Sequence, residues 1–346
     1  MDKLTATPQV LKQANLSLIR RTIREKGTAT RAEIAGETQI SSTTIRSLLS
    51  ELMENGEIES IGYDESSGGR KAERYRLKPD RYHGAVFCIS GQEMHSLLIN
   101  ACGEILETRY AEVPDWNFER EIICVLDQLT SQMEIKTVGI GVPGIVEGGS
   151  YWKKSLTDDS LYRVDIGERI SEKYGIPVVL ENNLNATTIG FGKCYQNQYP
   201  KESPEDIHMA YLHFSKGCVS AGFIAGGRII RGCHNFAGEL GLVPMEDGRF
   251  LDACMADEMD DAQYTKLIAR VIYWICAILN PQYIALAGSD LRTECIGPIG
   301  DIVYSYLEKP MVPEILYSSD VWQDYYHGMV SLTTERMFDQ IQLIKA

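Results

Sequence analysis

The sequence has no long hydrophobic run and no apolar signal core. A membrane-spanning helix needs about 20 consecutive apolar residues, and no stretch of this chain approaches that length. The N-terminal segment MDKLTATPQVLKQANL also lacks the small-residue cleavage site of an export signal. We therefore expect a cytoplasmic protein with no membrane partner.

Cysteine motifs are also missing. Nine cysteines are present, but none stand in a C-x-C or C-x-x-C pair. The odd number and the wide spacing disfavour both a disulfide framework and a cysteine zinc site. The scatter is typical of buried thiols in a reducing compartment, and it predicts no bound metal.

Basic residues are fewer than acidic residues in this chain. The chain has 34 Lys and Arg against 48 Asp and Glu, a net charge of -14, which argues against binding nucleic acid with the whole surface. The balance is uneven, because residues 1–81 carry a net charge of +2 and residues 82–346 a net charge of -16. With 346 residues of ordinary globular composition, the chain is long enough for two or three domains. A local basic module remains compatible with this composition.

The first 81 residues show the pattern of a winged helix-turn-helix domain. Thr30 and Glu33 have the spacing of a capping box, and Gly56 stands where a left-handed residue would end a helix. Apolar residues recur at helical spacing and then alternate as in strands. The predicted elements are helices over residues 10–26, 31–37 and 42–55, then strands over residues 57–61 and 74–77 around a wing loop.

This pattern predicts a DNA-binding surface. The third helix is the expected recognition helix, whose short polar side chains can reach phosphates and base edges in a major groove. Two basic residues at the wing tip suit phosphate neutralisation or insertion into the minor groove. The alternative is a small helical domain for protein contact, in which the hydroxyl residues only cap a helix. The candidate DNA-binding residues are Ser42, Thr43, Thr44, Arg46, Arg70 and Lys71.

The pattern of residues 82–346 predicts an α/β domain with two similar halves. Two successive series of strands each lead into α/β alternation, which favours two lobes with a cleft between them. Strands are predicted over residues 84–90, 94–100, 104–113, 137–141, 176–180, 209–214, 221–225, 228–231 and 283–286, and helices over residues 119–133, 186–196, 263–279, 297–307 and 326–338.

Four segments in this order resemble the ROK family of repressors, open reading frames and kinases. They are GIGVPG at 139–144, ENNLNA at 181–186, GRIIRG at 227–232 and AGELG at 237–241, preceded by a wing tip that reads GGRK at 68–71. The resemblance covers nearly the whole chain. It implies an actin-like, ribonuclease H-like fold of two lobes, and it points to the sugar-responsive transcription regulators of the family.

The nucleotide motifs of ROK kinases are altered here. The first phosphate hairpin reads ISGQE at 89–93 without the family's Asp, and the second phosphate loop reads KGCVSAG at 216–222, with fewer glycines. The adenosine-side glycines read AGS at 287–289. Asn183 replaces the Asp that acts as general base in family kinases, and an amide cannot accept a proton at neutral pH. We therefore predict a protein that is not an enzyme and has no cofactor.

The zinc motif of the family is also absent. Leu242 stands where the family's zinc-binding His would follow E-x-G, and the cysteine cluster beyond it is reduced to Cys254. One cysteine cannot close a tetrahedral site. The acidic run at 257–261 is expected to be a solvated loop in place of the zinc lobe.

The sugar pocket is partly retained. Amides and a carboxylate suit a neutral polyol, which needs paired donors and acceptors. An altered ligand, or none, stays open, because Asn182 and Asn185 could instead cap the helix near Ala186 and Glu239 could cap another element. The positions that match the family's ligand-binding residues are Pro143, Gly144, Asn182, Asn183 and Glu239.

Together these features predict a transcriptional regulator, expected to be a repressor of carbohydrate metabolism. It would bind double-stranded operator DNA as a homodimer or a dimer of dimers, since two recognition helices read a palindrome. Its inactive kinase-like domain would sense a sugar or sugar-phosphate effector. The alternatives are an active ROK sugar kinase and a regulator controlled by a protein partner.

Overall fold

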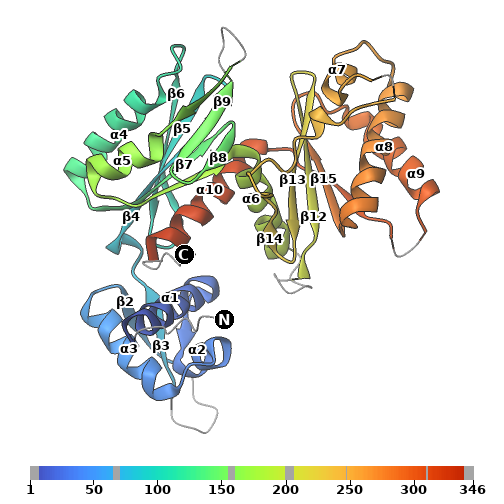
Figure 1. The fold of residues 1–346 in the computed structure, drawn as a ribbon. Helices are drawn as coiled ribbons and strands as arrows, with labels where there is room; N and C mark the ends of the chain where they lie inside the picture. The colour runs from blue at the N-terminus through green and yellow to red at the C-terminus, as the bar shows by residue number, and fades with distance from the viewer. Residues whose placement is uncertain are drawn as a thin grey trace, which may run out of the picture.

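The computed structural model describes residues 8–64, 71–154, 160–198, 206–246, 248–308 and 311–338. Figure 1 shows a small N-terminal unit, here called the head (residues 8–81), lying below a larger two-lobed part, the body (residues 82–338). Each lobe of the body contains one five-stranded sheet. The predicted α/β fold class with two actin-like lobes is confirmed.

The head has the helices and the wing strands expected from the sequence. Its core is made by apolar side chains from all three helices, with Ile19, Ile45 and Leu52 fully buried. A short first strand, β1, was not predicted, and it pairs with β3 to give a three-stranded sheet. The elements are α1 (Pro8–Lys26), β1 (Ala29–Thr30), α2 (Arg31–Thr38), α3 (Ser42–Glu54), β2 (Ile58–Tyr63), β3 (Glu73–Leu77) and the 3-10 turn η1 (Pro79–Arg81).

Local capping chemistry sets the helix boundaries in the head. The Thr30 hydroxyl accepts the Glu33 N–H, and the Glu33 carboxylate accepts the Thr30 N–H, so the predicted capping box is confirmed. Gly56 has a φ of 70°, a left-handed conformation that glycine adopts without steric cost. These contacts satisfy backbone groups that a helix end would otherwise leave without a partner.

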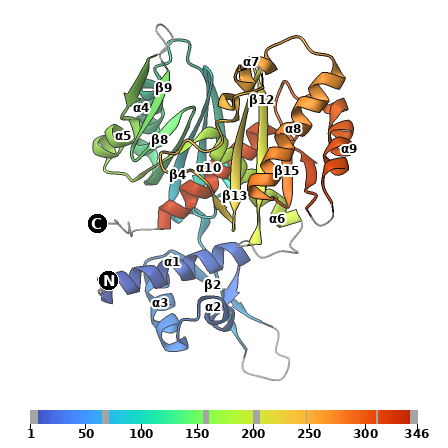
Figure 2. The same cartoon turned by 45° about the vertical axis from the view of Figure 1, so that its right-hand side comes forward.

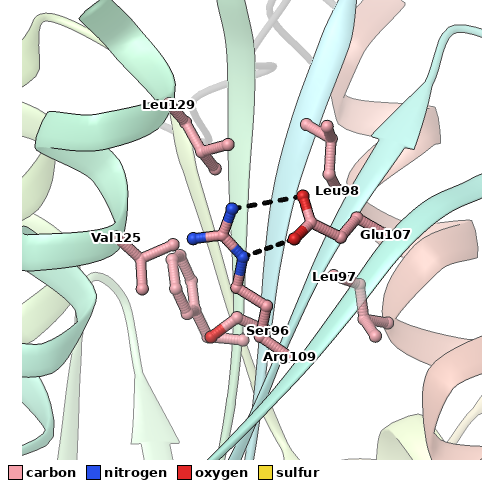
Figure 3. Close-up of a pocket in the computed structure, with 8 residues that line it drawn as sticks. Ser96, Leu97, Leu98, Glu107, Arg109, Val125 and Leu129 are labelled. Atoms are coloured by element: carbon pink, nitrogen blue, oxygen red, sulfur yellow. Dashed lines mark hydrogen bonds and ion pairs between the residues drawn. The ribbon is translucent and has the colours of Figure 1, made fainter.

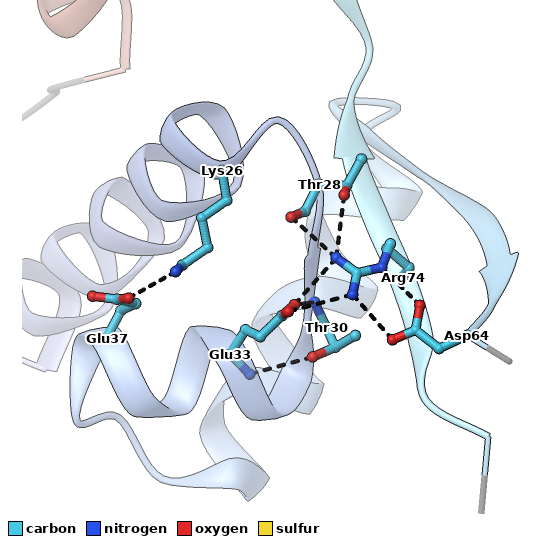
Figure 4. A network of polar contacts seen from close by, with 7 residues as sticks. All are labelled: Lys26, Thr28, Thr30, Glu33, Glu37, Asp64 and Arg74. Atoms are coloured by element: carbon cyan, nitrogen blue, oxygen red, sulfur yellow. Dashed lines mark hydrogen bonds and ion pairs between the residues drawn. The ribbon is translucent and has the colours of Figure 1, made fainter. Parts of the chain in front are cut away.

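Arg74 anchors the wing to the helices (Figure 4). From β3 its guanidinium donates to Asp64 (Nε to Oδ1, 2.8 Å), to Glu33 (Nη2 to Oε1, 3.3 Å) and to the hydroxyl of Thr28 (3.2 Å). One side chain thus joins both strands of the wing to the start of α2. This network ties the wing to the start of α2.

Lobe 1 has sheet order β11-β7-β4-β5-β6, in which the first three strands run parallel. Three short strands form a separate small sheet that was not predicted. The elements are β4 (His83–Ser90), β5 (Glu93–Asn100), β6 (Ile105–Glu112), α4 (Phe118–Gln132), β7 (Ile135–Val142), β8 (Ile145–Glu147), β9 (Ser150–Lys154), β10 (Leu161–Val164), α5 (Ile166–Tyr174) and β11 (Val178–Asn182).

Lobe 2 repeats this topology, with sheet order β14-β13-β12-β15-β16. In each lobe an antiparallel hairpin is extended by two parallel strands, which is the duplication expected from the two strand series. The elements are β12 (Met209–Ser215), β13 (Cys218–Ala225), β14 (Arg228–Ile229), the turn η3 (Leu240–Leu242), α7 (Leu251–Met255), α8 (Asp261–Leu279), β15 (Tyr283–Ala287), the turn η4 (Thr293–Cys295), α9 (Ile296–Tyr306) and β16 (Glu314–Tyr317).

Two helices, α6 (Asn183–Gln198) and α10 (Val321–Phe338), pack closely between the lobes. Figure 2 shows α10 running from this crossing toward the head. Glycines allow the close approach, because a Cβ on Gly190 or Gly328 would lie 1.8 Å from a backbone oxygen of the other helix. At the far end of α10, the Phe338 carbonyl accepts the Ser17 hydroxyl of α1 (3.2 Å). The helix therefore contacts both the lobe junction and the head.

One helix of the described chain, α8, is long and apolar enough to cross a membrane by length and composition. Eight of its residues are buried, and they pack in the core of lobe 2 with β12, β15 and α9. A core helix of a globular domain passes the same composition test. The packing therefore identifies α8 as part of the lobe 2 core.

Candidate functional site

The recognition helix α3 begins with a side-chain cap. The Ser41 Oγ accepts the Thr44 N–H (3.2 Å) and pairs with the Thr44 hydroxyl (2.8 Å). Thr44 is therefore half-buried in the cap, whereas Ser42, Thr43 and Arg46 are exposed. Of the four predicted DNA-reading residues on this helix, Thr44 is the one whose hydroxyl is engaged within the protein.

Two further serines extend the exposed face of α3. Thr43, Arg46, Ser47 and Ser50 follow one another at i, i+3, i+4 and i+7, and all four are exposed. The buried face of the helix is formed by Ile45, Leu48, Leu49 and Leu52. We call the four exposed residues the reading stripe. Ser47 and Ser50 were missed in the sequence, although the spacing of the buried residues points to them.

Ion pairs within the head reduce the number of cations available to a partner. Within the described part of the chain, Arg46 and Lys71 form no ion pair with a carboxylate, and both are exposed. Arg70 lies outside the described residues. In the described residues, the reading stripe and the wing therefore each present one exposed cation without an ion pair, Arg46 and Lys71. The paired cations include Lys12–Glu51, Arg20–Glu57, Lys26–Glu37 and Arg76–Glu59, at 2.6–2.8 Å.

The predicted ligand pocket lies where β7 and β11 of lobe 1 end. Asn182 Nδ2 donates to the Gly144 carbonyl (2.9 Å), so the structure brings these two predicted residues together. Asn182 Oδ1 accepts the N–H groups of Leu184 (2.9 Å) and Asn185 (3.0 Å), which caps α6. Asn182 therefore has a scaffold role in this conformation, and the neighbouring Pro143 is half-buried beside it.

Asn183 and Glu239 keep polar groups available. Asn183 Oδ1 accepts the Leu184 N–H (2.9 Å), and its Nδ2 has no hydrogen bond within the described chain. The alternative in which Glu239 caps another element is wrong for η3, which Glu239 precedes without a side-chain cap bond. As a residue Glu239 is exposed, yet its carboxylate is partly desolvated by the surrounding protein. This desolvation, followed by repulsion from Asp252, raises the pKa of Glu239.

A buried ion pair joins the two lobes beside this pocket. Glu181 ends β11 of lobe 1 with its side chain 6% exposed, and Arg231 follows β14 of lobe 2 with its side chain 39% exposed. Arg231 Nε donates to Glu181 Oε2 (3.0 Å), while Glu181 Oε1 accepts Asn185 Nδ2 (3.1 Å) and the Asn182 N–H (3.0 Å). Sequence reasoning missed this pair, although both residues lie in the family motifs.

A second contact reinforces the junction. Asn235, in the segment after Arg231, donates from Nδ2 to the Val146 carbonyl of β8 (2.5 Å). Its φ of 54° is left-handed, a conformation that asparagine tolerates better than most residues. The segment between β14 and η3 therefore spans from lobe 2 to lobe 1 and carries Glu239 at its end.

The altered phosphate loop is bonded to the protein's own carboxylates. Gly217 N–H donates to Asp290 Oδ2 (2.8 Å), and Val219 N–H donates to Asp252 Oδ1 (3.0 Å). Backbone N–H groups in such loops are the ones that bind phosphate oxygens in nucleotide sites. The Gly217 hydrogen bond, more than that of Ser289, lowers the pKa of Asp290, so this carboxylate stays ionised at neutral pH. Two of the loop's donors thus already have anionic acceptors.

The described residues offer no metal-binding cluster beside the predicted ligand residues, and two cavities of the structure lie elsewhere. No group of three His, Cys, Asp or Glu side chains in the described residues could hold a metal ion. One cavity of about 10 Å³ lies under α4, where Arg109 donates to Glu107 (2.6 Å) (Figure 3). Arg109 also donates to Gln128 (2.7 Å). It has room for no more than a water molecule. A wider hollow of about 430 Å³ lies by Lys136, Pro177 and Arg336, away from the predicted ligand residues.

Comparisons with known proteins agree with the motifs. The sequence model of the ROK family matches residues 88–258. The chain is 26% identical over 241 residues to the xylose repressor of Caldicellulosiruptor bescii, covering 67% of this chain and 59% of the relative. It is 25% identical to the xylose repressor of Bacillus subtilis, covering 67% and 60%. The match thus spans less than two thirds of these relatives' length.

A longer alignment and the solved structures extend the likeness. The chain is 20% identical over 316 residues to the Escherichia coli transcriptional dual regulator NagC, covering 84% of this chain and 75% of the relative. A ROK family transcriptional regulator, a homologue of the E. coli MLC protein, superposes with a TM-score of 0.71 at 15% identity, covering 94% of this chain and 99% of that one. The ROK hexokinase of Thermus thermophilus gives a TM-score of 0.54 at 15% identity, covering 72% and 97%. With the motifs and the two-lobed fold, these matches show that residues 88–258 of this chain belong to the ROK family.

Proposed function

We propose that this ROK-family chain is a transcriptional repressor of sugar utilisation. Residues 1–81 bind double-stranded operator DNA, and residues 82–346 sense a small effector in the cytoplasm. The relatives named as xylose repressors and NagC support this proposal. The observation that carries it is the reading stripe, because its polar side chains and Arg46 are exposed on the third helix of a winged fold.

The stripe has the chemistry that base reading needs. An arginine can donate two hydrogen bonds to guanine, and hydroxyls can bond to any base or phosphate. The exposed Lys71 precedes β3 of the wing, and we propose that it contacts the phosphate backbone of the DNA. The acidic body, with its net charge of -16, is repelled by DNA, so contact is confined to the head.

Selection from a random duplex library tests DNA binding directly. The full chain is expected to enrich one sequence with two inverted half-sites, spaced by about one helical turn. Binding measured by fluorescence anisotropy should weaken steeply with salt, as for any protein that neutralises phosphates. Failure to enrich a sequence, together with salt-independent binding, would contradict the proposal.

In the body, the cleft between the lobes is proposed to bind a sugar or a sugar derivative. Asn183 Nδ2 and the Glu239 carboxylate are the ligand-facing groups, with Asn182 and Gly144 as their support. Leu242 is exposed and adds an apolar surface to this site. It stands at the position where the resemblance to the ROK family implies a zinc-bound His. Calorimetry with pentoses, hexoses, amino sugars and their phosphates tests this site. We expect one of these sugars to bind the wild-type protein and to release it from the selected DNA. Asn183→Ala should abolish the binding of the sugar.

Phosphotransfer is not part of the proposed function. Asn183 cannot act as a general base, and Asp252 and Asp290 already accept N–H groups of the phosphate loop. Two fixed negative charges beside a triphosphate are repulsive. A coupled assay with Mg-ATP and the same sugar panel should show no turnover above the no-enzyme rate, and a measurable rate would overturn this part of the proposal.

The signal from the cleft to the head is proposed to travel along α10. This helix packs against α6 at the lobe junction, and its last residue, Phe338, contacts Ser17, Arg20 and Tyr82 near the head. A change in lobe closure would therefore move α1 and with it the recognition helix.

A further inference from the structure

The hollow of about 430 Å³ lies at the end of lobe 1 that adjoins the head. Strands β4, β7 and β11 run parallel and start at this end of the sheet, and β4 follows the head directly. Figure 2 shows that α10 also ends near the head. We call this hollow the joint hollow. It is lined by residues 134–136 at the start of β7, residues 175–177 before β11, and Arg336 and Met337 of α10.

The walls of the joint hollow are held in place by hydrogen bonds. Gly175 ends α5 with a φ of 66°, and its N–H donates to the Ser171 carbonyl (2.8 Å). The Pro177 carbonyl accepts the Val138 N–H (3.0 Å) and the Thr137 hydroxyl (3.3 Å). Small-molecule sites are typically concave, largely preformed and about 300–1,000 Å³ in volume. The joint hollow therefore has the size and the fixed walls of a ligand site.

The charged groups of the joint hollow favour an anion. Lys136 and Arg336 are half-buried in its lining, and Lys136 forms no ion pair with a carboxylate of the described residues. Glu134 also lines the hollow, but its Oε2 lies 3.7 Å from Nη1 of Arg81, which offsets its charge. Two cations and one partly neutralised carboxylate thus meet in a body whose net charge is -16. A local excess of positive charge attracts anionic ligands.

We propose that the joint hollow binds a small anion that carries an apolar group, at a site separate from the predicted sugar site. A phosphate or carboxylate group would pair with Lys136 and Arg336. An aromatic or alkyl part would lie against the apolar lining of Ile135, Ile176 and Pro177. A neutral sugar offers Lys136 no negative charge, so this ligand class differs from that of the sugar site.

Contacts of two lining residues lead from the joint hollow to the recognition helix. Lys136 Nζ lies 5.1 Å from the ring centroid of Tyr82, and Arg81 Cζ lies 4.5 Å from the same centroid. Arg81 faces Glu134 and also donates from Nε to the carbonyl of Asn55 at the end of α3 (3.1 Å). An anion that attracts Lys136 and repels Glu134 would change these contacts and thereby the position of α3. This effect on DNA binding rests on the proposed function.

Fluorescence titration of the full chain with anilinonaphthalene sulfonate, an aromatic anion, tests the site without DNA. Wild type should bind the probe at one saturable site. Lys136→Met should weaken this binding about 10-fold, because it removes a charged partner and keeps the apolar stem. Glu134→Gln should tighten it at least about twofold, a gain that damage to the fold would not produce.

Lys153→Met is the matched control. Lys153 is also half-buried in lobe 1, and its Nζ lies 5.3 Å from the ring centroid of Tyr162. This variant loses the same charge and a similar ring contact, and it should bind the probe as wild type does. Thermal unfolding of each variant verifies that it folds.

Competition defines the ligand class. Phenyl phosphate should displace the probe at a lower concentration than inorganic phosphate, which lacks the apolar group. Equal displacement by the two, no saturable binding to wild type, or equal losses in Lys136→Met and Lys153→Met would overturn the inference. Binding that appears only when the chain is cut after Phe338 would also overturn it, since residues 339–346 would then be the occupant.

Operator binding separates this inference from the proposed function. Saturating phenyl phosphate should change the affinity of wild type for the selected operator by at least about fivefold and leave that of Lys136→Met unchanged. An unchanged wild-type affinity would overturn the link to the head. A protein that binds the probe but no DNA would contradict the proposed function alone. One that binds DNA but not the probe would contradict this inference alone.

Discussion

The reading stripe of the head and the predicted ligand site of the body use polar residues in opposite ways. On α3 the stripe residue Arg46 has no carboxylate partner within the described chain. At the predicted ligand site, Glu181, Asn182 and Arg231 are bonded to one another and to the backbone. A side chain without an internal partner costs little stability to remove, whereas a buried and bonded one costs a great deal. The comparison separates residues available for recognition from those that hold the site together.

The largest expected effect is at the lobe junction. Arg231→Ala would leave the Glu181 carboxylate buried without its cation, which should lower the free energy of unfolding by about 3 kcal/mol. Urea unfolding measures this loss. Arg163→Ala, which removes an exposed partner of Asp165, is the control and should cost about 0.5 kcal/mol or less. If Glu181→Gln does not restore stability in the Arg231→Ala background, the buried charge is not the cause.

The next effect concerns DNA affinity alone. Arg46→Ala should weaken binding to the selected operator by about 1–3 kcal/mol, roughly 5- to 150-fold, and relax specificity at one base pair. Its free energy of unfolding should change by less than about 0.5 kcal/mol, since Arg46 is exposed and unpaired. Lys12→Ala removes the same charge from an ion pair with Glu51 and should leave affinity nearly unchanged. Equal losses in both variants would mean that the head acts only through its net charge.

A smaller effect distinguishes neighbours at the start of α3. Ser41→Ala removes the N-cap acceptor of the Thr44 N–H and should destabilise the protein by about 1 kcal/mol. Thr43→Ala, two residues on, should leave stability within about 0.5 kcal/mol while weakening operator binding. Thermal unfolding and anisotropy on the same samples separate the two. If Thr43→Ala destabilised the protein, Thr43 would have a structural role and would not belong to the reading stripe.

The smallest expected effect is pH-dependent. Hydrogen bonding to Gly217 lowers the pKa of Asp290 in the folded state, so its contribution to stability is present above the unfolded pKa and is lost as pH falls through the folded value. Asp290→Asn should therefore lower stability by under about 1 kcal/mol near pH 7, because the group is exposed. The difference from wild type should shrink below about pH 4. A difference that grows in acid would contradict the assignment.

Helix ends and the fold class could be predicted because their causes are local. The Thr30–Glu33 capping box joins groups three residues apart, and Gly56 needs only its own conformational freedom. The strand series of the two lobes follow from alternating hydrophobicity. Asn182 was predicted both as a ligand residue and as a cap, and the cap is what the structure contains. Its role in ligand binding stays a prediction.

The small sheet of β8 to β10 was not predicted, because its strands are short and partly polar. Likewise, the Glu181–Arg231 pair joins residues 50 positions apart in different lobes. The two carboxylates on the phosphate loop come from α7 and from the turn after β15. Such pairings depend on how the lobes pack, and no spacing within a motif encodes them.

The sequence by itself determined that a basic winged head precedes an acidic two-lobed body of the ROK type, because charge and hydrophobic period are properties of short segments. Tertiary structure alone decided which polar residues remain available. Packing brought Arg231 onto Glu181 and Asp290 onto Gly217, and it left the reading stripe exposed and the half-buried Asn183 with no hydrogen bond from its Nδ2 in the described chain. A polar group's availability depends on its neighbours in space, and those are set only when the chain folds.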